Sequence, residues 1–216
     1  MSEDVQGEDG GQAERFWEGH YRAHERVWSG SANALLVDIA GSLPVGTALD
    51  LGCGEGGDAI WLARLGWRVT AVDVSATALD RAATRATAAG VAARIDFQRH
   101  DLAHSFPAGA FDLVSALYLQ SPVEFPRDRV LQGAARVVAL GGLLFIVEHA
   151  SIAPWSWNQD PDRRFPTQEE TLAALDLPPG QWDTERLGAP ERLATGPNGE
   201  SATVADNVIA VRRRAA

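Results

Sequence analysis

The sequence predicts an α/β fold in which helices cover both faces of one mostly parallel sheet. Strand-like and helix-like segments alternate between residues 48 and 147, a pattern that is typical of a parallel sheet covered on both faces. The helical segments end at glycines, Gly66 and Gly90, and Ser75 is a good N-cap. The chain of 216 residues is long enough for one domain, because a chain of this size buries about 70% of its unfolded surface.

The expected elements follow one another along the chain. Two helices are expected within residues 12–41, separated by a break at Ser29–Gly30, and the first carries a stripe of aromatic residues. Seven strands are expected over residues 48–51, 67–72, 94–98, 111–117, 143–147, 181–188 and 202–213. Helices are expected over about residues 57–65, 75–89 and 126–139, with a short capped helix after Thr167.

The first fourteen residues differ in composition from the rest of the chain. They contain five acidic residues, no basic residue and almost no apolar side chain. Such a segment cannot bury enough apolar surface to fold. Residues 1–14 are therefore expected to form an acidic disordered tail and residues 15–216 a single domain. The arginines at positions 212–214 are interpreted as a solvated tail at the other end.

Composition excludes several kinds of chemistry and partner. All 19 basic residues are arginine, which excludes a Schiff-base lysine and a phosphate-loop lysine. With a net charge of −10, the chain is a poor electrostatic match for nucleic acid or for a membrane surface, so neither is expected as a partner. A lone cysteine, Cys53, and the lack of a signal peptide or spanning apolar run predict a cytoplasmic location.

A glycine-rich turn follows the first strand, in the sequence A-L-D-L-G-C-G-E-G-G-D over residues 48–58. Its glycines allow a tight turn and the close approach of a ligand to the backbone. The turn also satisfies the dinucleotide fingerprint G-x-G-x-x-G, and Asp73 follows Gly52 by twenty-one residues, a plausible distance for a ribose contact. One alternative is therefore a nicotinamide-dependent oxidoreductase.

The acidic residues of the turn favour a different ligand. Asp50, Glu55 and Asp58 surround the place where a dinucleotide enzyme holds a pyrophosphate, and they would repel it. The ammonium and sulfonium groups of S-adenosylmethionine are attracted by the same charges. The turn therefore predicts S-adenosyl-L-methionine as the cofactor.

The segment D-L-G-C-G-E-G resembles the signature of class I S-adenosylmethionine-dependent methyltransferases, and the resemblance covers roughly residues 12–213. The W-x-x-x-Y pattern near the N-terminus and the size of the chain are similar to the small thiopurine, tellurite-resistance and halide/thiol methyltransferase branch. The resemblance implies a single Rossmann-like seven-stranded sheet, mostly parallel, with a C-terminal antiparallel hairpin and an N-terminal helical cap.

The resemblance also implies where the methionine and ribose parts of the cofactor bind. Asp50, Gly52 and Gly54 are implied to hold the methionine end, and Leu117 to lie beside it. Asp73 is implied to accept both ribose hydroxyls, although Asp73 at a strand end is also compatible with a simple turn.

Adenine contacts and the cover of the site are implied in the same way. Val74 is implied to pack on the adenine, Asp101 to accept its amino proton and Leu102 to provide a backbone contact. Asp101 is equally compatible with a cap. The cover of the site is assigned to three aromatic residues, which are equally compatible with core packing: Trp17, Tyr21 and Trp28.

Candidate catalytic residues lie at the carboxyl ends of the fourth and fifth strands, where open α/β sheets bind ligands. Tyr118 and His149 are the candidate base or orienting residues, and His149 is equally compatible with a capped loop histidine. His20 and His24 are one helical turn apart, but no third ligand is evident, so no metal site is expected.

A long irregular stretch after Glu148 contains further candidates for the acceptor pocket. Trp155, Trp157 and Phe165 are expected to form an apolar wall, with Arg163 or Arg164 available for an anionic substrate. The same side chains are also compatible with anchoring the loop on the core.

Together these observations predict a methyltransferase that acts on a small-molecule acceptor by in-line methyl transfer. A second alternative is a non-catalytic module that binds S-adenosylmethionine. The sequence leaves open the acceptor and its atom (sulfur, oxygen, nitrogen, halide or metalloid), the use of a general base and the oligomeric state.

Overall fold

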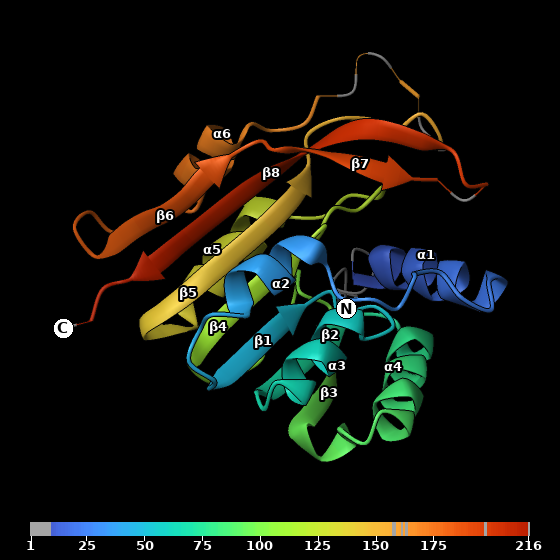
Figure 1. Ribbon diagram of the computed structural model, residues 1–216, viewed down its shortest axis with the longest axis horizontal. Coiled ribbons are helices and arrows are strands. Elements are labelled where there is room, and N and C mark those ends of the chain that lie inside the picture. Colours follow the sequence, from blue (N-terminus) through green and yellow to red (C-terminus); the bar gives the residue numbers. More distant parts are fainter. Residues whose placement is uncertain (1–9, 157–158, 161, 163, 197, 216) are drawn as a thin grey trace, which may run out of the picture.

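Strands and helices alternate in the computed structural model, which describes residues 10–156, 159–160, 162, 164–196 and 198–215 (Figure 1). The helices are α1 (Gly10–Ala23), α2 (Ala34–Ala40), α3 (Gly57–Arg64), α4 (Ala76–Ala88), α5 (Arg127–Arg136) and α6 (Gln168–Ala174). The strands are β1 (Thr47–Leu51), β2 (Arg68–Asp73), β3 (Ile95–Arg99), β4 (Phe111–Leu117), β5 (Val138–His149), β6 (Trp182–Gly188), β7 (Glu191–Thr195) and β8 (Ser201–Arg213). All seven expected strands are present, and β7 is an additional strand that the sequence pattern did not predict.

Seven of these strands form one path through the sheet, in the order β3-β2-β1-β4-β5-β8-β6. The first five are parallel, whereas β8 runs antiparallel to β5 and to β6. The expected Rossmann-like sheet with antiparallel C-terminal strands is thus confirmed. The strand order reverses between β1 and β4, and open α/β sheets bind their ligands outside the carboxyl ends of the strands at such a point.

Helices cover both faces of the sheet (Figure 1). Leu36 of α2 and Leu62 of α3 enter one buried core with Phe145 of β5, whereas Leu131 of α5 enters the opposite core with Ile146. Adjacent residues of β5 therefore enter opposite cores, because successive side chains of a strand point to opposite faces. None of the helices within the described residues combines the length and the apolar character needed to cross a lipid bilayer.

The additional strand β7 extends the long strand β8 beyond the main sheet. Residues 191–195 pair with residues 201–205 at the start of β8, whereas residues 206–212 of β8 pair with β5. Figure 1 shows this hairpin reaching over the side of the molecule where α1 lies. The hairpin therefore adds side chains to the carboxyl-end edge of the parallel strands.

The N-terminal helix begins earlier than the sequence predicts. α1 starts at Gly10, so residues 10–14 are helical rather than part of a disordered tail, and Glu14 forms an ion pair with Arg99. The acidic segment expected over residues 1–14 otherwise lies outside the described residues.

The same helix also ends earlier than predicted. It stops at Ala23, so Trp28 does not continue its aromatic stripe. The backbone amides of Val27 and Trp28 instead donate to the carboxylate of Glu55, and Arg81 donates to the carbonyl oxygen of His24. These long-range contacts hold residues 24–31 in an irregular conformation, and we call this segment the N-terminal strap.

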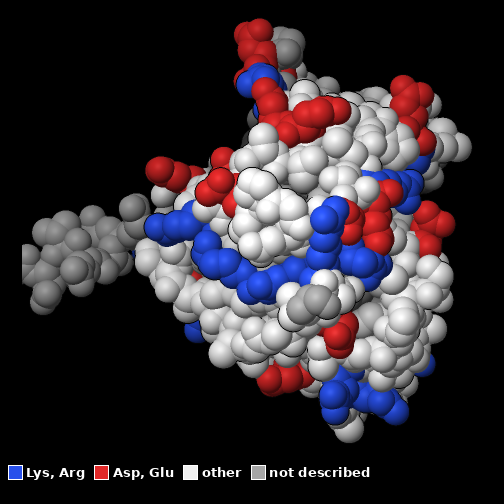
Figure 2. Space-filling view, turned by 90° about the vertical axis from the view of Figure 1, so that its left-hand side faces the viewer, with Lys and Arg blue, Asp and Glu red and all other residues white. Residues whose placement is uncertain are grey.

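The C-terminal arginines belong to the fold and do not form a solvated tail. Arg212 lies in β8 and pairs with Glu185, and Arg213 donates to the carbonyl oxygen of Val138. Arg214 pairs with Asp183 of β6. Figure 2 views the side of the molecule where β8 ends and shows arginine side chains in a band that acidic side chains border. This mixed surface follows from the pairing of basic and acidic residues on neighbouring strands.

Candidate functional site

The glycine turn brings the chain from the end of β1 to the start of α3. Gly52 and Gly54 have positive φ angles, 70° and 53°, which disfavour side chains. A Cβ on Gly52 would lie 2.7 Å from Leu119, and one on Gly54 would lie 2.9 Å from the hydroxyl of Tyr21. Both positions therefore favour glycine for two reasons: the backbone has a positive φ angle, and a side chain would clash with a neighbouring residue.

Asp50 is a buried acid on β1, immediately before this turn. Only 3% of the residue is exposed, and its Oδ1 accepts a hydrogen bond from Ser115 at 3.2 Å. Its Oδ2 makes no hydrogen bond among the described residues. Burial, together with the negative charges of Asp58 and Asp73, raises the pKa of Asp50 to about 8. A positively charged group at Oδ2 would satisfy this oxygen and stabilise the ionised carboxylate.

Asp58 lies in the first turn of α3 and adds to the same negative region. The backbone amide of Asn33, the N-cap of α2, donates to its Oδ1 at 2.6 Å. Burial nevertheless raises the pKa of Asp58 to about 6. Two neighbouring acids with raised pKa values mark a place where negative charge is in excess, and such places favour a cationic ligand.

Glu55, the third acid of the turn, does not face the same region. Its carboxylate binds Arg81 of α4 at 3.0 Å and accepts the amides of Val27 and Trp28 in the N-terminal strap. The expectation that Glu55 acts on the ligand with Asp50 and Asp58 is therefore wrong. Its charge is instead neutralised by an arginine that the local sequence pattern does not identify.

Asp73 ends β2 beside the turn. Its Oδ2 accepts the amide of Gly54 and its Oδ1 accepts the amide of Ser75, both at 2.9 Å. Burial raises the pKa of Asp73. The carboxylate thus joins the glycine turn to the start of α4, and each oxygen keeps a second lone pair for a ligand hydroxyl. The contact of Asp73 with ribose and that of Val74 with adenine remain predictions.

The two candidate catalytic residues lie next to each other at the ends of β4 and β5. The rings of Tyr118 and His149 are stacked, with centroids 4.4 Å apart. Tyr118 has a φ of 53°, which is rare for a residue other than glycine and turns its side chain sharply after Leu117. The two candidates therefore lie side by side, and their catalytic role remains a prediction.

Two residues that the sequence did not single out complete this cluster. Asp206 of β8 accepts a hydrogen bond from the hydroxyl of Tyr118 at 2.9 Å and lies 3.5 Å from Nδ1 of His149. Arg192 of β7 donates to Asp206 and lies 3.2 Å from the Tyr118 hydroxyl. Burial and the Asp206 charge raise the pKa of Tyr118 to about 12. We call these four residues the Asp206 cluster.

Comparison with known proteins gives the relationship of this chain. Residues 48–142 match the family model described as "Methyltransferase domain". The chain is 36% identical over 141 residues to an uncharacterized protein of Synechococcus, covering 63% of this chain and 31% of that protein. It is 36% identical over 129 residues to the 2-methyl-6-phytyl-1,4-hydroquinone methyltransferase of Synechocystis, covering 58% of this chain and 36% of that enzyme.

A solved structure agrees with this relationship over nearly the whole chain. The subject of that structure is the conversion of a disulfide bond into a thioacetal group during echinomycin biosynthesis. The structure is 25% identical, with a TM-score of 0.71 over 93% of this chain and 92% of that one. The matched domain is that of the class I S-adenosylmethionine-dependent methyltransferases. The chain spans about a third of the length of the curated relatives named above.

The residues of this methyltransferase-family chain fit S-adenosylmethionine. The unpaired, buried Oδ2 of Asp50 suits the ammonium group of the methionine part. The close approach around Gly52 and Gly54 leaves no room for a side chain at the turn. The acids Asp50 and Asp58 favour a cation there, which a pyrophosphate does not offer.

Aromatic residues from the N-terminal part of this chain lie against the glycine turn. The indole nitrogen of Trp28 donates to the hydroxyl of Tyr21 at 2.8 Å. The ring atoms of Trp28 would lie 3.1 Å from a Cβ on Gly54. Trp17 packs on Tyr21 with ring centroids 6.4 Å apart. Tyr21 therefore reaches the turn from α1 and Trp28 from the N-terminal strap, and their role as cover of the cofactor remains a prediction.

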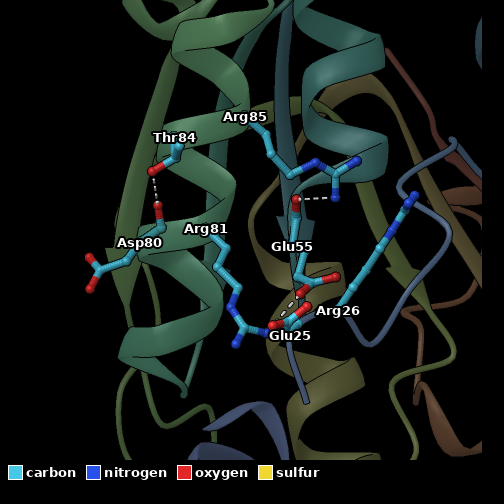
Figure 3. Close-up of a pocket in the computed structure, with 7 residues that line it drawn as sticks. All are labelled: Glu25, Arg26, Glu55, Asp80, Arg81, Thr84 and Arg85. Atoms are coloured by element: carbon cyan, nitrogen blue, oxygen red, sulfur yellow. Dashed lines mark hydrogen bonds and ion pairs between the residues drawn. The ribbon is translucent and has the colours of Figure 1, made fainter.

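A pocket of about 600 Å³ lies behind the strap, between it and α4 (Figure 3). Figure 3 shows Arg81 and Arg85 reaching from α4 toward Glu55. Arg85 donates to the carbonyl oxygens of Glu55 and Gly30. Together with the bond from Arg81 to the carbonyl oxygen of His24, these contacts attach both ends of the strap to α4.

Asp101 and Leu102 lie just beyond β3. The carboxylate of Asp101 accepts the amide of Ala103 at 3.0 Å and lies 3.2 Å from Nδ1 of His104. Asp101 therefore caps a turn, not the helix start that the alternative interpretation proposed. Leu102 packs against the core on the α5 side. Contact of either residue with adenine remains a prediction.

Trp155, in the irregular stretch after Glu148, lies against the β7–β8 hairpin. A Cβ on Gly196 would lie 2.6 Å from the ring of Trp155, so Trp155 anchors the loop to the hairpin. Arg164 pairs with Glu170 of α6. Trp157 and Arg163, which were expected to line the acceptor pocket, lie outside the described residues.

Two of the four residues of the Asp206 cluster, Arg192 on β7 and Asp206 on β8, were not predicted from the sequence. Asp206 is the one acidic residue in the expected strand 202–213, and its isolation in an apolar pattern was the available signal. Arg192 gave no comparable signal, because its strand was itself not predicted.

Proposed function

We propose that this chain is an S-adenosylmethionine-dependent methyltransferase that transfers a methyl group in line to a small-molecule acceptor. The observation that carries the proposal is the buried Asp50, whose Oδ2 has no hydrogen-bond partner among the described residues and which shares a region of excess negative charge with Asp58. A cofactor with a positive charge is the ligand that this arrangement favours.

The order of the strands supports a position of the Asp206 cluster next to the methionine end of the proposed cofactor site. β1 pairs with β4 through Leu51 and Ala116, and β4 pairs with β5 through Leu117 and Val147. Neighbouring strands are about 4.8 Å apart. Tyr118 is therefore one strand away from the glycine turn and His149 two strands away, a separation that a small acceptor can bridge.

S-adenosylmethionine supplies an electrophilic methyl group when it is bound. The residues of this chain then have two tasks: Asp50 and the glycine turn hold the methionine end, and the Asp206 cluster orients the acceptor on the far side of the methyl group. Positioning of this kind provides a large part of the rate of a two-substrate reaction. His149 is the proposed base for an acceptor that carries a proton.

The setting of the site and one relative support a small acceptor. Tyr21 and Trp28 cover the glycine turn, and the β7–β8 hairpin reaches over the same edge of the sheet. The Synechocystis relative is named as a hydroquinone methyltransferase. Because the chain has a net charge of −10, we propose neither a nucleic acid nor a membrane surface as its partner. A cytoplasmic location is also part of the proposal.

Calorimetry separates the proposed function from a nicotinamide-dependent oxidoreductase. S-adenosylmethionine and S-adenosylhomocysteine are expected to bind, and Asp50→Asn to weaken that binding about 10- to 100-fold, the effect of losing one bond between charged groups. Asp183→Asn, at a distant ion pair on β6, is the matched control. Binding of NAD instead, unaffected or improved by Asp50→Asn, would overturn the proposal.

A methyl-transfer assay then addresses the second alternative, a non-catalytic binding module. Transfer of labelled methyl to any compound in a panel of thiols, phenols, iodide and tellurite supports an enzyme. Tight cofactor binding without transfer to small molecules or to ribosomal RNA supports a binding module. Preferential labelling of the RNA would contradict the small-molecule part of the proposal.

A further inference from the structure

Asp206 joins three side chains that come from three other strands or strand ends. Tyr118 follows β4, His149 ends β5 and Arg192 lies on β7. We propose that Asp206 is a positioning residue that holds His149 as a general base, and that the acceptor is a small molecule with an ionisable O–H or S–H group. This inference rests on the proposed methyltransferase function and specifies its acceptor class.

The register of the sheet brings the acid and the imidazole together. His149 and Asp206 are direct partners in the antiparallel pairing of β5 and β8. Side chains of directly opposed residues lie on the same face of the sheet, and here Nδ1 of His149 faces Oδ1 of Asp206 at 3.5 Å. The Nδ1 edge of the ring is therefore directed at the acid, and Nε2 forms no hydrogen bond with a side chain or backbone group of the described residues.

Burial differs sharply between the two partners. Asp206 is 1% exposed, whereas 49% of the His149 side chain is exposed. The acid is thus fixed within the fold while the imidazole stands at the edge of the site. An Nδ1 proton directed at a carboxylate leaves Nε2 unprotonated, which is the form that accepts a proton from a bound molecule.

The other two members keep Asp206 in its ionised form. Arg192 donates to Oδ2 through Nε, and the Tyr118 hydroxyl donates to the same oxygen. Although burial acts in the opposite direction, the hydrogen bonds from Arg192 and Tyr118, together with the neighbouring His149, lower the pKa of Asp206. An ionised acid with these partners orients its neighbours and does not itself take up a proton.

Tyr118 has a supporting role in the same arrangement. Its hydroxyl is a donor to Asp206, and its ring lies against the imidazole at an interplanar angle of 25°. The contact restricts the plane of the His149 ring. Of the two residues that the sequence proposed as bases, His149 therefore takes the proton and Tyr118 orients it.

The proposed step is balanced without a further reactant. The acceptor O–H or S–H proton moves to Nε2 of His149 while the acceptor oxygen or sulfur uses a lone pair to form a bond to the methyl carbon. The bond between that carbon and the cofactor sulfur breaks, and its electron pair stays on the sulfur of the departing thioether. The imidazolium, stabilised by Asp206, then releases its proton to solvent.

The test compares Asp206→Asn and His149→Gln with wild type on a series of phenols and thiols of decreasing pKa. For acceptors that are protonated at the assay pH, kcat/KM is expected to fall about 100-fold in His149→Gln and about tenfold in Asp206→Asn. For 4-nitrophenol assayed at a pH where it is ionised, both variants are expected to lose much less than for protonated acceptors, because no base is needed and only the orienting contribution of the cluster is lost. Asp183→Asn is the matched control.

A second measurement does not depend on the acceptor. In ¹⁵N-labelled protein, the imidazole nitrogen shifts of His149 report which nitrogen is protonated. Wild type is expected to show an unprotonated Nε2, and Asp206→Asn a mixture of the two tautomers. If Asp206→Asn does not fold, the comparison of kcat/KM for protonated and ionised acceptors is made with His149→Gln, whose mutated side chain is half-exposed.

The outcomes separate this inference from the proposed function. If wild type fails to bind S-adenosylmethionine in calorimetry, the proposed function is wrong. If it binds and the variants lose protonated and ionised acceptors equally, or if the His149 tautomer is the same in Asp206→Asn, the positioning role is wrong while the function stands. Efficient methylation of iodide or tellurite with no transfer to phenols or thiols would overturn the acceptor class.

Discussion

The carboxylate of Glu55 lies 3.0 Å from Nη1 of Arg81, so the central acid of the glycine turn is paired with α4. Glu55 is 3% exposed and also accepts the amides of Val27 and Trp28. One buried charge thus attaches the turn, the N-terminal strap and α4 to one another. The ion pair of Glu55 and Arg81 therefore holds the strap in place, and with it Trp28, part of the proposed cover of the cofactor site.

Replacement of Arg81 is expected to destabilise the fold through this buried acid. Arg81→Gln leaves Glu55 without its cation, and we expect a loss of about 1–3 kcal/mol in the free energy of unfolding, below the full cost of a deeply buried pair because Arg81 is partly exposed. Urea denaturation measures the loss. Arg99→Gln, which breaks the exposed pair with Glu14, is expected to cost less than about 1 kcal/mol. Equal losses in the two variants would contradict the special role of Glu55.

Substitution of Gly54 is expected to separate the backbone cost of a positive φ angle from the steric cost of a side chain near Tyr21. Gly54→Ala places a Cβ 2.9 Å from the Tyr21 hydroxyl at a φ of 53°, and we expect a loss of about 2–4 kcal/mol in stability. Gly141→Ala has a similarly positive φ with open space around it, so only the backbone cost of about 1 kcal/mol is expected. Thermal unfolding of both variants gives the difference, and similar losses would show that Tyr21 and Trp28 do not press on the turn.

Stability of the cofactor-free protein is expected to fall as the pH rises through the range set by Asp50. The pKa of Asp50 is raised from 3.8 to about 8 in the fold, so the folded state binds more protons than the unfolded state between these values. Stability is then greatest at the acidic end of this range and is lost progressively toward pH 8. Thermal unfolding between pH 4 and pH 9 is expected to show a shallower decline in Asp50→Asn than in wild type, and parallel curves would refute the assignment.

The same raised pKa predicts proton release when the cofactor binds. A cationic ligand group near Asp50 favours the ionised carboxylate. Below about pH 8, binding of S-adenosylmethionine is therefore expected to release protons, and calorimetry in buffers of different ionisation enthalpy measures their number. Asp50→Asn is expected to release fewer protons, and an unchanged number would place the cation elsewhere.

Docking of α1 is expected to depend on Glu18. Although burial opposes it, hydrogen bonds from Ser75 and Thr77 at the start of α4 lower the pKa of Glu18 to about 2. A lowered pKa stabilises the fold above about pH 4.5, and this contribution is lost as the pH falls toward 2. In hydrogen exchange at neutral pH, Glu18→Gln is expected to reduce the protection of α1 while leaving β4 unchanged, and Glu14→Gln, an exposed ion-pair residue, serves as control. Unchanged protection in Glu18→Gln would contradict the docking role.

The sequence by itself determined the sheet and the centre of the site. Apolar runs between glycine and cap signals located all seven strands of the main path, because strand formation and helix ends depend on neighbouring residues. Asp50, Gly52 and Gly54 could be singled out for the same reason, since the turn and its acid lie within a few positions of one another. Tyr118 and His149 followed from the rule that ligands bind at the carboxyl ends of strands.

Only the tertiary structure decided which charges meet. Glu55 pairs with an arginine 26 residues away, and Tyr118 meets Asp206 across 88 residues and Arg192 across 74. Such contacts depend on the order and register of strands, which the residues around each position do not specify. Trp28 left the predicted helix because a distant carboxylate binds its backbone amide. Local pattern therefore determined where the cofactor is proposed to bind, whereas packing determined how the site is covered and which residue supports the proposed base.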